Sequence, residues 1–202
     1  MRITYFISKM IEKIKIMLLL IKLSHYRTIL HFECKNCGSN PRLYSPISIK
    51  GLKHFNIGND FKLDYHGIIE AWDQHNGIIY KPTVSIGNNV SIGKRFHLGC
   101  INKIIIEDDV LIGSDVLMID HNHGKADYSD ALIAPNRRSL SSKGGIHICK
   151  NVWIGEKVCV LPGVTIGENS IVGANAVVTR DIPNNCIVCG NPAKIVKRIK
   201  ID

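Results

Sequence analysis

The sequence lacks a long apolar run. Near the N-terminus the uninterrupted run Ile16–Ile21 is too short for the core of a secretory signal, and no small-residue cleavage site follows it. The run is also far too short to span a bilayer. The seven cysteines are an odd number. Without an export signal we expect a cytoplasmic protein whose thiols are reduced.

Leucine and charged residues are scarce as well. Only 21% of the 202 residues are charged and 45% are apolar, which excludes a disordered chain and allows one sizeable core or at most two small ones. The chain has 14 Leu beside 33 Ile and 13 Val. Leucine normally leads in helical proteins, so this excess of β-branched residues indicates strands. The 16 Asn and 17 Gly indicate many turns.

Acidic residues are fewer than basic ones, and the imbalance lies at the ends of the chain. The formal net charge is +9. Residues 1–30 contain six Lys and Arg against Glu12, and residues 193–202 contain four against Asp202. Aromatic residues, 6% of the chain, are not interleaved with these basic residues. The pattern disfavours nucleic acid as a partner and leaves an anionic membrane or a phosphorylated ligand.

Residues 1–32 alternate apolar and basic positions at helical spacing, which predicts an amphipathic helix or a pair of helices. The apolar residues on one side are Phe6, Met10, Ile14, Met17 and Ile21. Two interpretations remain open. We favour a helix that packs on the body of the protein, because the charged face is short for a lipid binder; the other is a peripheral contact with anionic lipid at the inner face of the membrane. Residues 33–56 are turn-rich and lead into the next zone.

From Ile57 onward the chain repeats itself with a period of six. Branched aliphatic residues recur six apart at Ile148, Ile154, Val160, Ile166, Val172 and Val178. The same phase returns upstream at Ile86, Ile92 and Leu98 and, after a two-residue slip, at Ile106, Ile112 and Met118. This period fits neither a helix nor a simple strand and is typical of a parallel β-helix with three sixes in each coil. We therefore predict an all-β fold whose aliphatic residues point into the core while Gly or Asn turns the corners.

The repeat is broken once, between Met118 and Ile148. The stretch between them is polar, contains Pro135 and has two glycines near its end, so we read it as a loop excursion over residues 121–147. Long loops in compact domains are usually functional. The predicted organisation is an amphipathic helical segment over 1–32, a β-helix over 33–192 that carries this excursion, and a basic C-terminal tail over 193–202.

The ordered motifs of the C-terminal half resemble those of a known family. They are IDHNHG from Ile119, NVWIGEKVCVLPGVTIGENSIVGANAVVTRDIP from Asn151 and GNPAKIVKRI from Gly190. The chain is similar to the hexapeptide-repeat acyltransferases, most of all to sugar O-acetyltransferases that modify capsule or lipopolysaccharide units and to maltose and galactoside O-acetyltransferases. The resemblance covers residues 40–200 or so. It implies a left-handed β-helix, a homotrimer, acetyl-CoA as co-substrate, and direct transfer of the acetyl group to a hydroxyl or amine.

His121 is the candidate general base. Transfer from a thioester to an alcohol needs a base on the alcohol proton, and an imidazole suits this role at cytoplasmic pH. The resemblance implies a catalytic histidine where the excursion begins, which is His121, and His123 competes for the role. Asp120 is a candidate to orient the imidazole. Adjacent residues on an extended strand point to opposite faces, which argues against contact between Asp120 and His121.

The resemblance also implies a set of residues that contact CoA. They are Glu156, Ala174, Thr179, Arg180, Lys194 and Lys197. Arg and Lys suit the phosphates of CoA. Arg180 stands where Lys is common in the family, and Glu156 stands where a small residue is common, so we expect its contact to be through the backbone.

Two further residues belong to the predicted site. Trp153 is at the sixth position of its repeat and should point away from the core, toward the cofactor or a subunit interface. Asn102 lies in the coil before the one that leads to His121, and we take it as the candidate acceptor-binding residue.

We expect no metal. His121 and His123 can supply two ligands, but no third follows at a convincing spacing. The pairs Cys34/Cys37 and Cys186/Cys189 are too far apart in sequence for the usual four-thiolate zinc site.

The sequence therefore predicts an enzyme that transfers an acetyl group from acetyl-CoA to a hydroxyl of a sugar or glycan building block. Histidine acts as general base, without a covalent enzyme intermediate. Two alternatives remain open: N-acetylation of a nucleotide-linked amino sugar or another small amine, and a β-helix that is a scaffold or a metalloprotein. The last would draw zinc ligands from His97, His121, His123 and His147.

Overall fold

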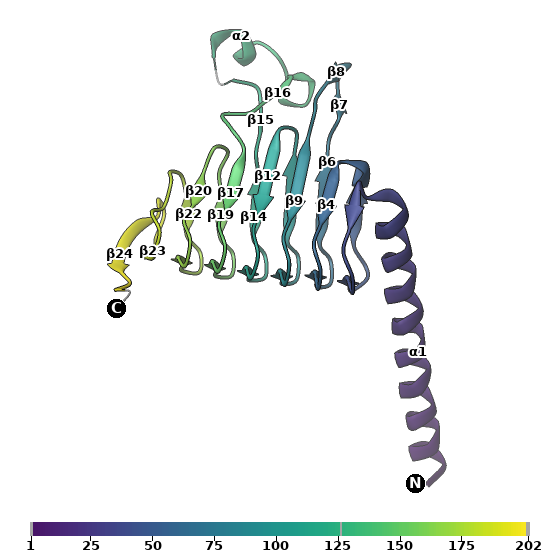
Figure 1. Ribbon diagram of the computed structural model, residues 1–202. Helices are drawn as coiled ribbons and strands as arrows, with labels where there is room; N and C mark the ends of the chain where they lie inside the picture. The colour runs from purple at the N-terminus through teal and green to yellow at the C-terminus, as the bar shows by residue number, and fades with distance from the viewer. Residues whose placement is uncertain (1, 126, 201–202) are drawn as a thin grey trace.

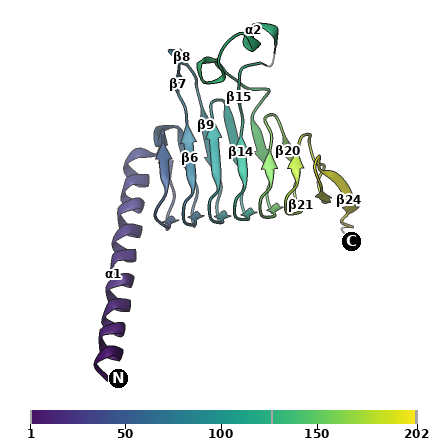
Figure 2. The same cartoon turned by 180° about the vertical axis from the view of Figure 1, so that it is seen from behind.

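The computed structural model describes residues 2–125 and 127–200. Stacked triangular coils form a solenoid, from which one long helix and two loop excursions project (Figures 1 and 2). Met1 of the predicted helical segment, Ala126 of the predicted excursion and residues 201–202 of the predicted tail lie outside the described residues.

Three parallel sheets, named A, B and C here, form the walls of the solenoid. Sheet A stacks β1 (Asn36–Cys37), β4 (Phe55–Ile57), β9 (Thr83–Ile86), β12 (Lys103–Ile106), β17 (Ile146–Ile148) and β20 (Thr165–Ile166). Sheet B stacks β2 (Arg42–Leu43), β5 (Lys62–Leu63), β10 (Ser91–Ile92), β13 (Leu111–Ile112), β18 (Trp153–Ile154), β21 (Ile171–Val172), β23 (Cys186–Cys189) and β24 (Lys194–Arg198). Sheet C stacks β3 (Ser48–Lys50), β6 (Ile68–Ala71), β11 (His97–Cys100), β14 (Leu117–Ile119), β19 (Cys159–Val160) and β22 (Val177–Val178). Strand β24, within the segment predicted as a tail, pairs antiparallel with β23.

The first aliphatic residue of each six points into the core, as the repeat predicts. Three successive six-residue repeats begin with Ile106, Ile112 and Met118, and these side chains are at most 1% exposed. Their side chains stack on the equivalent residues of the neighbouring coils, because Ile92 pairs with Ile112 in sheet B. The prediction of an all-β parallel β-helix is confirmed.

The spacing of six is kept at two of the three corners in every coil. Sheet A leads to sheet B over six residues, from Ile86 to Ile92, and sheet B leads to sheet C over six more, to Leu98. The corner from sheet C to sheet A, which we call the C–A corner, is different. It takes eight residues from Leu98 to Ile106, thirty from Met118 to Ile148 and six from Val160 to Ile166. All variation in coil length therefore falls at this corner.

Asparagine turns the corner from sheet A to sheet B. Asn89, Asn151 and Asn169 have left-handed backbone angles, with φ of 54°, 56° and 58°. Asparagine tolerates this region better than most residues. The amides also form a ladder, because Asn151 Nδ2 donates to Asn169 Oδ1 at 2.8 Å and Asn169 Nδ2 donates to Asn185 Oδ1 at 2.9 Å. The corners therefore explain much of the high asparagine content of the chain.

The prediction that the repeat is broken once is wrong, because two excursions leave the C–A corner. The predicted one carries β15 (Asn122–His123), α2 (Tyr128–Ala131), the 3₁₀ turn η2 (Pro135–Arg137) and β16 (Leu140–Ser141). A second excursion follows β6 and carries the hairpin β7 (Gln74–His75) and β8 (Ile78–Ile79). The solenoid also starts before Ile57, since the turn-rich zone forms the first coil, with β1 to β3 and the 3₁₀ turn η1 (Leu52–His54).

Helix α1 (Arg2–Glu33) closes one end of the solenoid with its last turns. Leu30 is fully buried in the core, and Tyr26 and Ile29 pack against it. The rest of α1 projects past the edge of the coils (Figure 1). Within the described ranges, no helix has both the length and the apolar character needed to cross a membrane.

The two Cys-x-x-Cys pairs lie at opposite ends of the solenoid. Cys34 follows α1 and Cys37 ends β1 in the first coil, whereas Cys186 and Cys189 bound β23 near the last one. One chain cannot bring the four thiols to a single ion. Burial, with smaller effects from Cys37 and Glu33, raises the pKa of Cys34 to about 12, so this thiol is protonated at neutral pH.

We expect Leu30→Ala to lower the free energy of unfolding by about 2–5 kcal/mol, because it opens a cavity where α1 caps the core. Leu20→Ala makes the same change on the exposed part of the helix, where Leu20 is 60% exposed, and should cost less than about 0.5 kcal/mol. Urea unfolding of both variants measures the difference. Equal stability of the two would contradict the capping role.

Candidate active site

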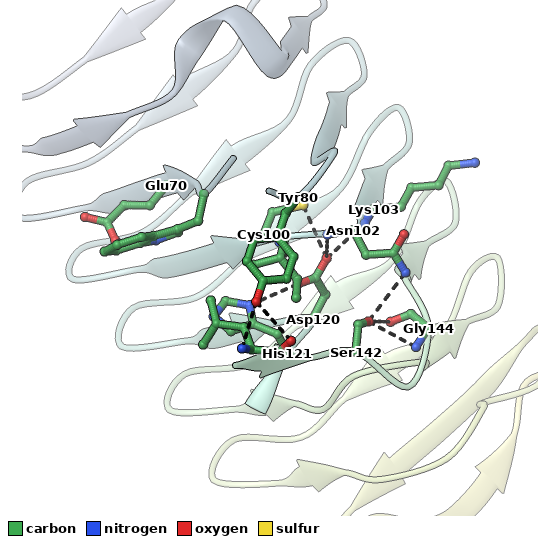
Figure 3. A network of polar contacts seen from close by, with 12 residues as sticks. Glu70, Tyr80, Cys100, Asn102, Lys103, Asp120, His121, Ser142 and Gly144 are labelled. Carbon is green, nitrogen blue, oxygen red and sulfur yellow. Dashed lines mark hydrogen bonds and ion pairs between the residues drawn. The ribbon is translucent and has the colours of Figure 1, made fainter. Parts of the chain in front are cut away.

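Asp120 and His121 follow β14, where the larger excursion leaves the C–A corner. Asp120 is fully buried although it is a carboxylate. Its two oxygens accept hydrogen bonds from the backbone N–H groups of Ile101, Asn102 and Lys103, each at 2.9 Å (Figure 3). Three consecutive donors of this kind offset the cost of taking a charge out of water.

These donors come from the slip in the repeat. Eight residues instead of six connect Leu98 to Ile106, and the added length forms a bend that places Ile101–Lys103 against Asp120 of the next coil. Cys100 Sγ donates a further hydrogen bond to Asp120 Oδ2 at 3.3 Å. Burial, reinforced by the charge of Asp120, raises the pKa of the Cys100 thiol, which keeps it a donor. All partners of Asp120 are thus donors, as an ionised carboxylate requires.

Asp120 contacts the imidazole of its neighbour, contrary to the prediction from strand geometry. His121 Nδ1 lies 3.0 Å from Asp120 Oδ1. The alternation rule does not apply because β14 ends at Ile119 and the chain bends at Asp120. Since the carboxylate can only accept, Nδ1 carries the proton and donates, which leaves Nε2 with a lone pair. The predicted carboxylate–imidazole pair therefore exists as a geometric unit.

Gly99 makes room for this imidazole on the outer surface of sheet C. A Cβ at position 99 would lie 3.3 Å from His121 Cε1 and 3.4 Å from a side-chain carbon of Ile119. Even an alanine would therefore press on the ring. The His121 side chain is 11% exposed, so it is held in place but reaches solvent.

A pocket of about 190 Å³ opens beside His121. Sheet C forms its floor, the β7–β8 hairpin gives one wall and the larger excursion gives another. The lining residues are Glu70, Trp72, His75, His97, Gly99, Ile119, His121, His123 and Leu140. Trp72 Nε1 donates to Glu70 Oε2 at 3.1 Å, and Lys50 Nζ lies 3.2 Å from the centre of the Trp72 ring. The pocket thus combines an aromatic surface with a carboxylate.

Tyr80 joins the two excursions through Leu140, which lines the pocket. Its hydroxyl accepts from Leu140 N at 2.9 Å and lies 3.3 Å from Leu140 O, to which it donates. The repeat pattern did not predict the second excursion, which carries Trp72, His75 and Tyr80, or the place of Glu70 on β6 beside it. The available signal was the interval of seventeen residues from Ile69 to Ile86, which is not a multiple of six.

The histidines of the predicted site do not all lie together. His121, not His123, is the one bonded to Asp120; His123 is exposed on β15, with its ring centre 5.7 Å from that of His75. His97 joins them in the pocket. His147 is on sheet A, where its Nε2 lies 2.6 Å from Glu107 Oε1, and its ligand atoms group with those of Glu107 and Cys149. The four histidines of the metalloprotein alternative are therefore divided between two walls.

The residues predicted to contact CoA fall into three groups. Thr179 and Arg180 are exposed at the C–A corner, two strands beyond β14 in sheet C, which places them about 10 Å from His121 along the stack. Trp153, 51% exposed on sheet B, and Glu156 and Ala174 lie at or near the corner from sheet B to sheet C. Lys194 and Lys197 are on β24. Only the first group shares an edge with His121.

Asn102 lies beside the pocket-forming residues, at the bend between β11 and β12. Its backbone N–H is one of the donors to Asp120, and its side-chain Nδ2 lies 3.4 Å from Ser142 Oγ. A second hollow of about 520 Å³ adjoins this region, and Lys125, Arg138 and Lys143 of the excursion line it together with His123. Three cations in one hollow suit an anionic ligand.

Comparisons with known proteins identify the family of the chain. Residues 145–180 match the family described as bacterial transferase hexapeptide (six repeats). The chain is 36% identical over 157 residues to the putative lipopolysaccharide biosynthesis O-acetyl transferase WbbJ of Escherichia coli K12, and the match covers 76% of each chain. It is 34% identical over 126 residues to the galactoside O-acetyltransferase of the same bacterium, over 57% of each chain.

Solved structures share the fold. AntD, an N-acyltransferase from Bacillus cereus, in complex with dTDP and 3-hydroxybutyryl-CoA, has a TM-score of 0.70 at 21% identity and is covered over 88% of its length by 87% of this chain. A hexapeptide-repeat acetyltransferase from Vibrio cholerae in complex with acetyl-CoA has a TM-score of 0.57 at 26% identity, with 78% of it covered by 88% of this chain. The fold is thus the left-handed parallel β-helix of acyltransferases. The chain belongs to the hexapeptide-repeat acyltransferases, and it is an acetyltransferase that uses acetyl-CoA as co-substrate.

We expect Asp120→Asn to lower the free energy of unfolding by about 1–3 kcal/mol, because the amide nitrogen would face N–H donors and leave a buried one unpaired. Acetyl transfer should fall as well, since the imidazole loses the acceptor that fixes its tautomer. Asp109→Asn is the matched control, because Asp109 is exposed at a corner where Asn89 and Asn151 occupy the equivalent position. Urea unfolding and thiol release measure both effects. An Asp120→Asn protein as stable as the control would contradict this account.

Proposed function

We propose that the protein acetylates a hydroxyl of a sugar or glycan building block, with His121 as the general base. The observation that carries the proposal is the hydrogen bond between Asp120 and His121 Nδ1, which makes Nε2 the basic nitrogen of a residue that lines the pocket. The relatives named as lipopolysaccharide and galactoside O-acetyltransferases support a sugar hydroxyl as acceptor.

His121 and Asp120 have different roles in the proposed acetyl transfer. Acetyl-CoA supplies the acetyl group as a thioester, which the acceptor oxygen attacks directly. His121 Nε2 takes the hydroxyl proton as the new C–O bond forms, and Asp120 stabilises the resulting imidazolium. The same proton is then available for the departing CoA sulfur. His123, two residues further on, lines the pocket but lacks the bond to Asp120 that orients His121.

The acceptor side of the pocket suits a sugar. Trp72 and His75 give it an aromatic wall, and Glu70 gives it a hydrogen-bond acceptor. Sugar rings present apolar C–H faces and hydroxyl donors, which such a pairing can bind. Asn102 remains our candidate for a further contact with the acceptor, because the bend that it shares with Ile101 lies beside the pocket.

The co-substrate fits along the C–A corner. Thr179 and Arg180 lie on the same edge as His121, two strands further along sheet C. We assign CoA contacts to these residues, to Lys194 and Lys197, and to Glu156, Ala174 and Trp153. Because all of these except Thr179 and Arg180 lie away from this edge, they would serve a site formed with a neighbouring solenoid.

We therefore propose a homotrimer. Two rows of apolar side chains on the outer walls support it. One row runs through register partners on sheet B: Leu111, Trp153, Ile171 and Ile187. The other runs through Leu117, Cys159 and Val177 on sheet C. Leu111 and Trp153 are each half exposed in the single chain, and rows of this kind suit contact between copies.

The hollow around Lys125, Arg138 and Lys143 favours a second candidate acceptor, a nucleotide-linked sugar, whose diphosphate these cations would bind. AntD, solved with dTDP and with a dTDP-linked amino sugar, has the same fold and is an N-acyltransferase. Thiol release measured with matched free, nucleotide-linked and lipid-linked sugars, bearing hydroxyls or amines, distinguishes the candidates.

We expect His121→Ala to reduce acetyl transfer by at least about 100-fold, because it removes the general base. Affinity for CoA and the oligomeric state should not change. His123→Ala is the matched control and should keep activity within about threefold, since His123 does not contact Asp120. Acceptor-dependent thiol release measures the rates. If His123→Ala is the inactive variant, the base has been misassigned.

Arg180→Ala and Lys194→Ala should raise the KM for acetyl-CoA by about tenfold each and leave kcat nearly unchanged, because they remove charges that pair with phosphate. Lys81→Ala, in the second excursion, removes an equal charge elsewhere and should not affect the KM. Sedimentation would establish that the assembly is intact. Unchanged KM values would remove both residues from the co-substrate site.

A further inference from the structure

Helix α1 carries an exposed apolar stripe along half of its length. The stripe consists of Phe6, Met10, Ile14, Met17 and Ile21, which are 43–70% exposed. Residues three, four and seven apart share one face of a helix, so these side chains form a continuous band. Water-exposed bands of this size on a single helix mark an interaction surface.

The stripe faces away from the solenoid. At 3.6 residues per turn, its centre lies on the side of the helix opposite Tyr26 and Leu30, and these two residues contact the first coil. The prediction that α1 packs on the body therefore holds only for its last turns. In both views the helix runs crosswise to the stack, at its N-terminal end (Figures 1 and 2). A flat surface could cover the stripe without touching the coils.

Basic residues flank the stripe. Lys13 lies along one edge, and Lys15 and Lys22 lie beyond the other edge, while Glu12 is on the far side and pairs with Lys9 at 2.9 Å. Residues 2–33 contain six Lys and Arg against two Glu. Long basic side chains can extend from an apolar helix face to phosphate headgroups. The helix has no span long and apolar enough to cross a bilayer, so the pattern is that of an interfacial helix.

We propose that α1 binds an anionic membrane surface. The stripe enters the boundary between headgroups and acyl chains, the flanking lysines contact lipid phosphates, and the solenoid stands with its first coil toward the bilayer. A second copy of α1 is the other possible occupant of the stripe. The flanking positive charge favours lipid, because two identical basic helices repel each other.

The test is flotation of the full-length protein with vesicles of phosphatidylcholine alone or of equal parts phosphatidylcholine and phosphatidylserine. We expect the protein to bind the anionic vesicles at least about tenfold better, and salt to weaken binding. Met17→Glu should reduce binding about tenfold or more. Ile16→Glu makes the same charge change at an adjacent residue off the stripe, with 58% exposure against 54% for Met17, and should reduce binding less than about threefold.

Two measurements keep the outcomes separate. Thiol release in solution should be the same for both variants and the parent, because neither residue touches the active site. Failure of the parent protein to float overturns the proposal. If Met17→Glu instead dissociates an oligomer of a parent protein that does not float, the stripe binds another copy of α1. Equal loss of binding in both variants would also contradict the proposal. The added negative charge, and not its position on the stripe, would then determine binding to vesicles.

Discussion

The buried carboxylate of Asp120 is the interaction on which the proposed active site depends. It accepts from the bend over Ile101–Lys103 in one coil and from His121 in its own, so it ties two coils together at the point where the larger excursion starts. Burial of this charge would be costly without its donors. The bend, the carboxylate and the imidazole hold one another in place through these hydrogen bonds. They form one unit whose geometry is set before a substrate binds.

The surroundings of this unit preserve its geometry. Gly99 leaves space for the ring on sheet C, and Tyr80 fixes the excursion that starts at His121 to the smaller excursion that starts at Trp72. The pocket walls come from segments some sixty residues apart in sequence, joined by two hydrogen bonds of the Tyr80 hydroxyl and by hydrogen bonds from Asn76 Nδ2 to the carbonyls of Asn136 and Arg138. A preorganised base is worth more than a mobile one, because no orientation has to be found during the reaction.

Much of the fold could be predicted from the sequence, because an aliphatic residue points into the core once in every six residues. Asparagines with left-handed backbone angles turn the corners between them. His121 is selected over His123 because the resemblance implies a histidine where the excursion begins, and the structure adds its hydrogen bond to Asp120. The contact between Asp120 and His121 could not be predicted, because it depends on the strand ending at Ile119, and strand ends are not encoded in the period. The hairpin was missed because Ile78 and Ile79 look like further core residues, yet both are exposed. The direction of the stripe on α1 required knowing which residues cap the solenoid.

The uneven corners of the solenoid separate two kinds of evolutionary change. An insertion within a wall shifts the phase of every later side chain and turns core residues outward, so selection should remove it. An insertion at the C–A corner returns the chain to sheet A in register, whether it adds two residues or many. New loops can therefore be gained or exchanged beside His121 without disturbing the coils. A single scaffold can acquire a new substrate by lengthening one corner, while the sequences of the three sheets stay unchanged.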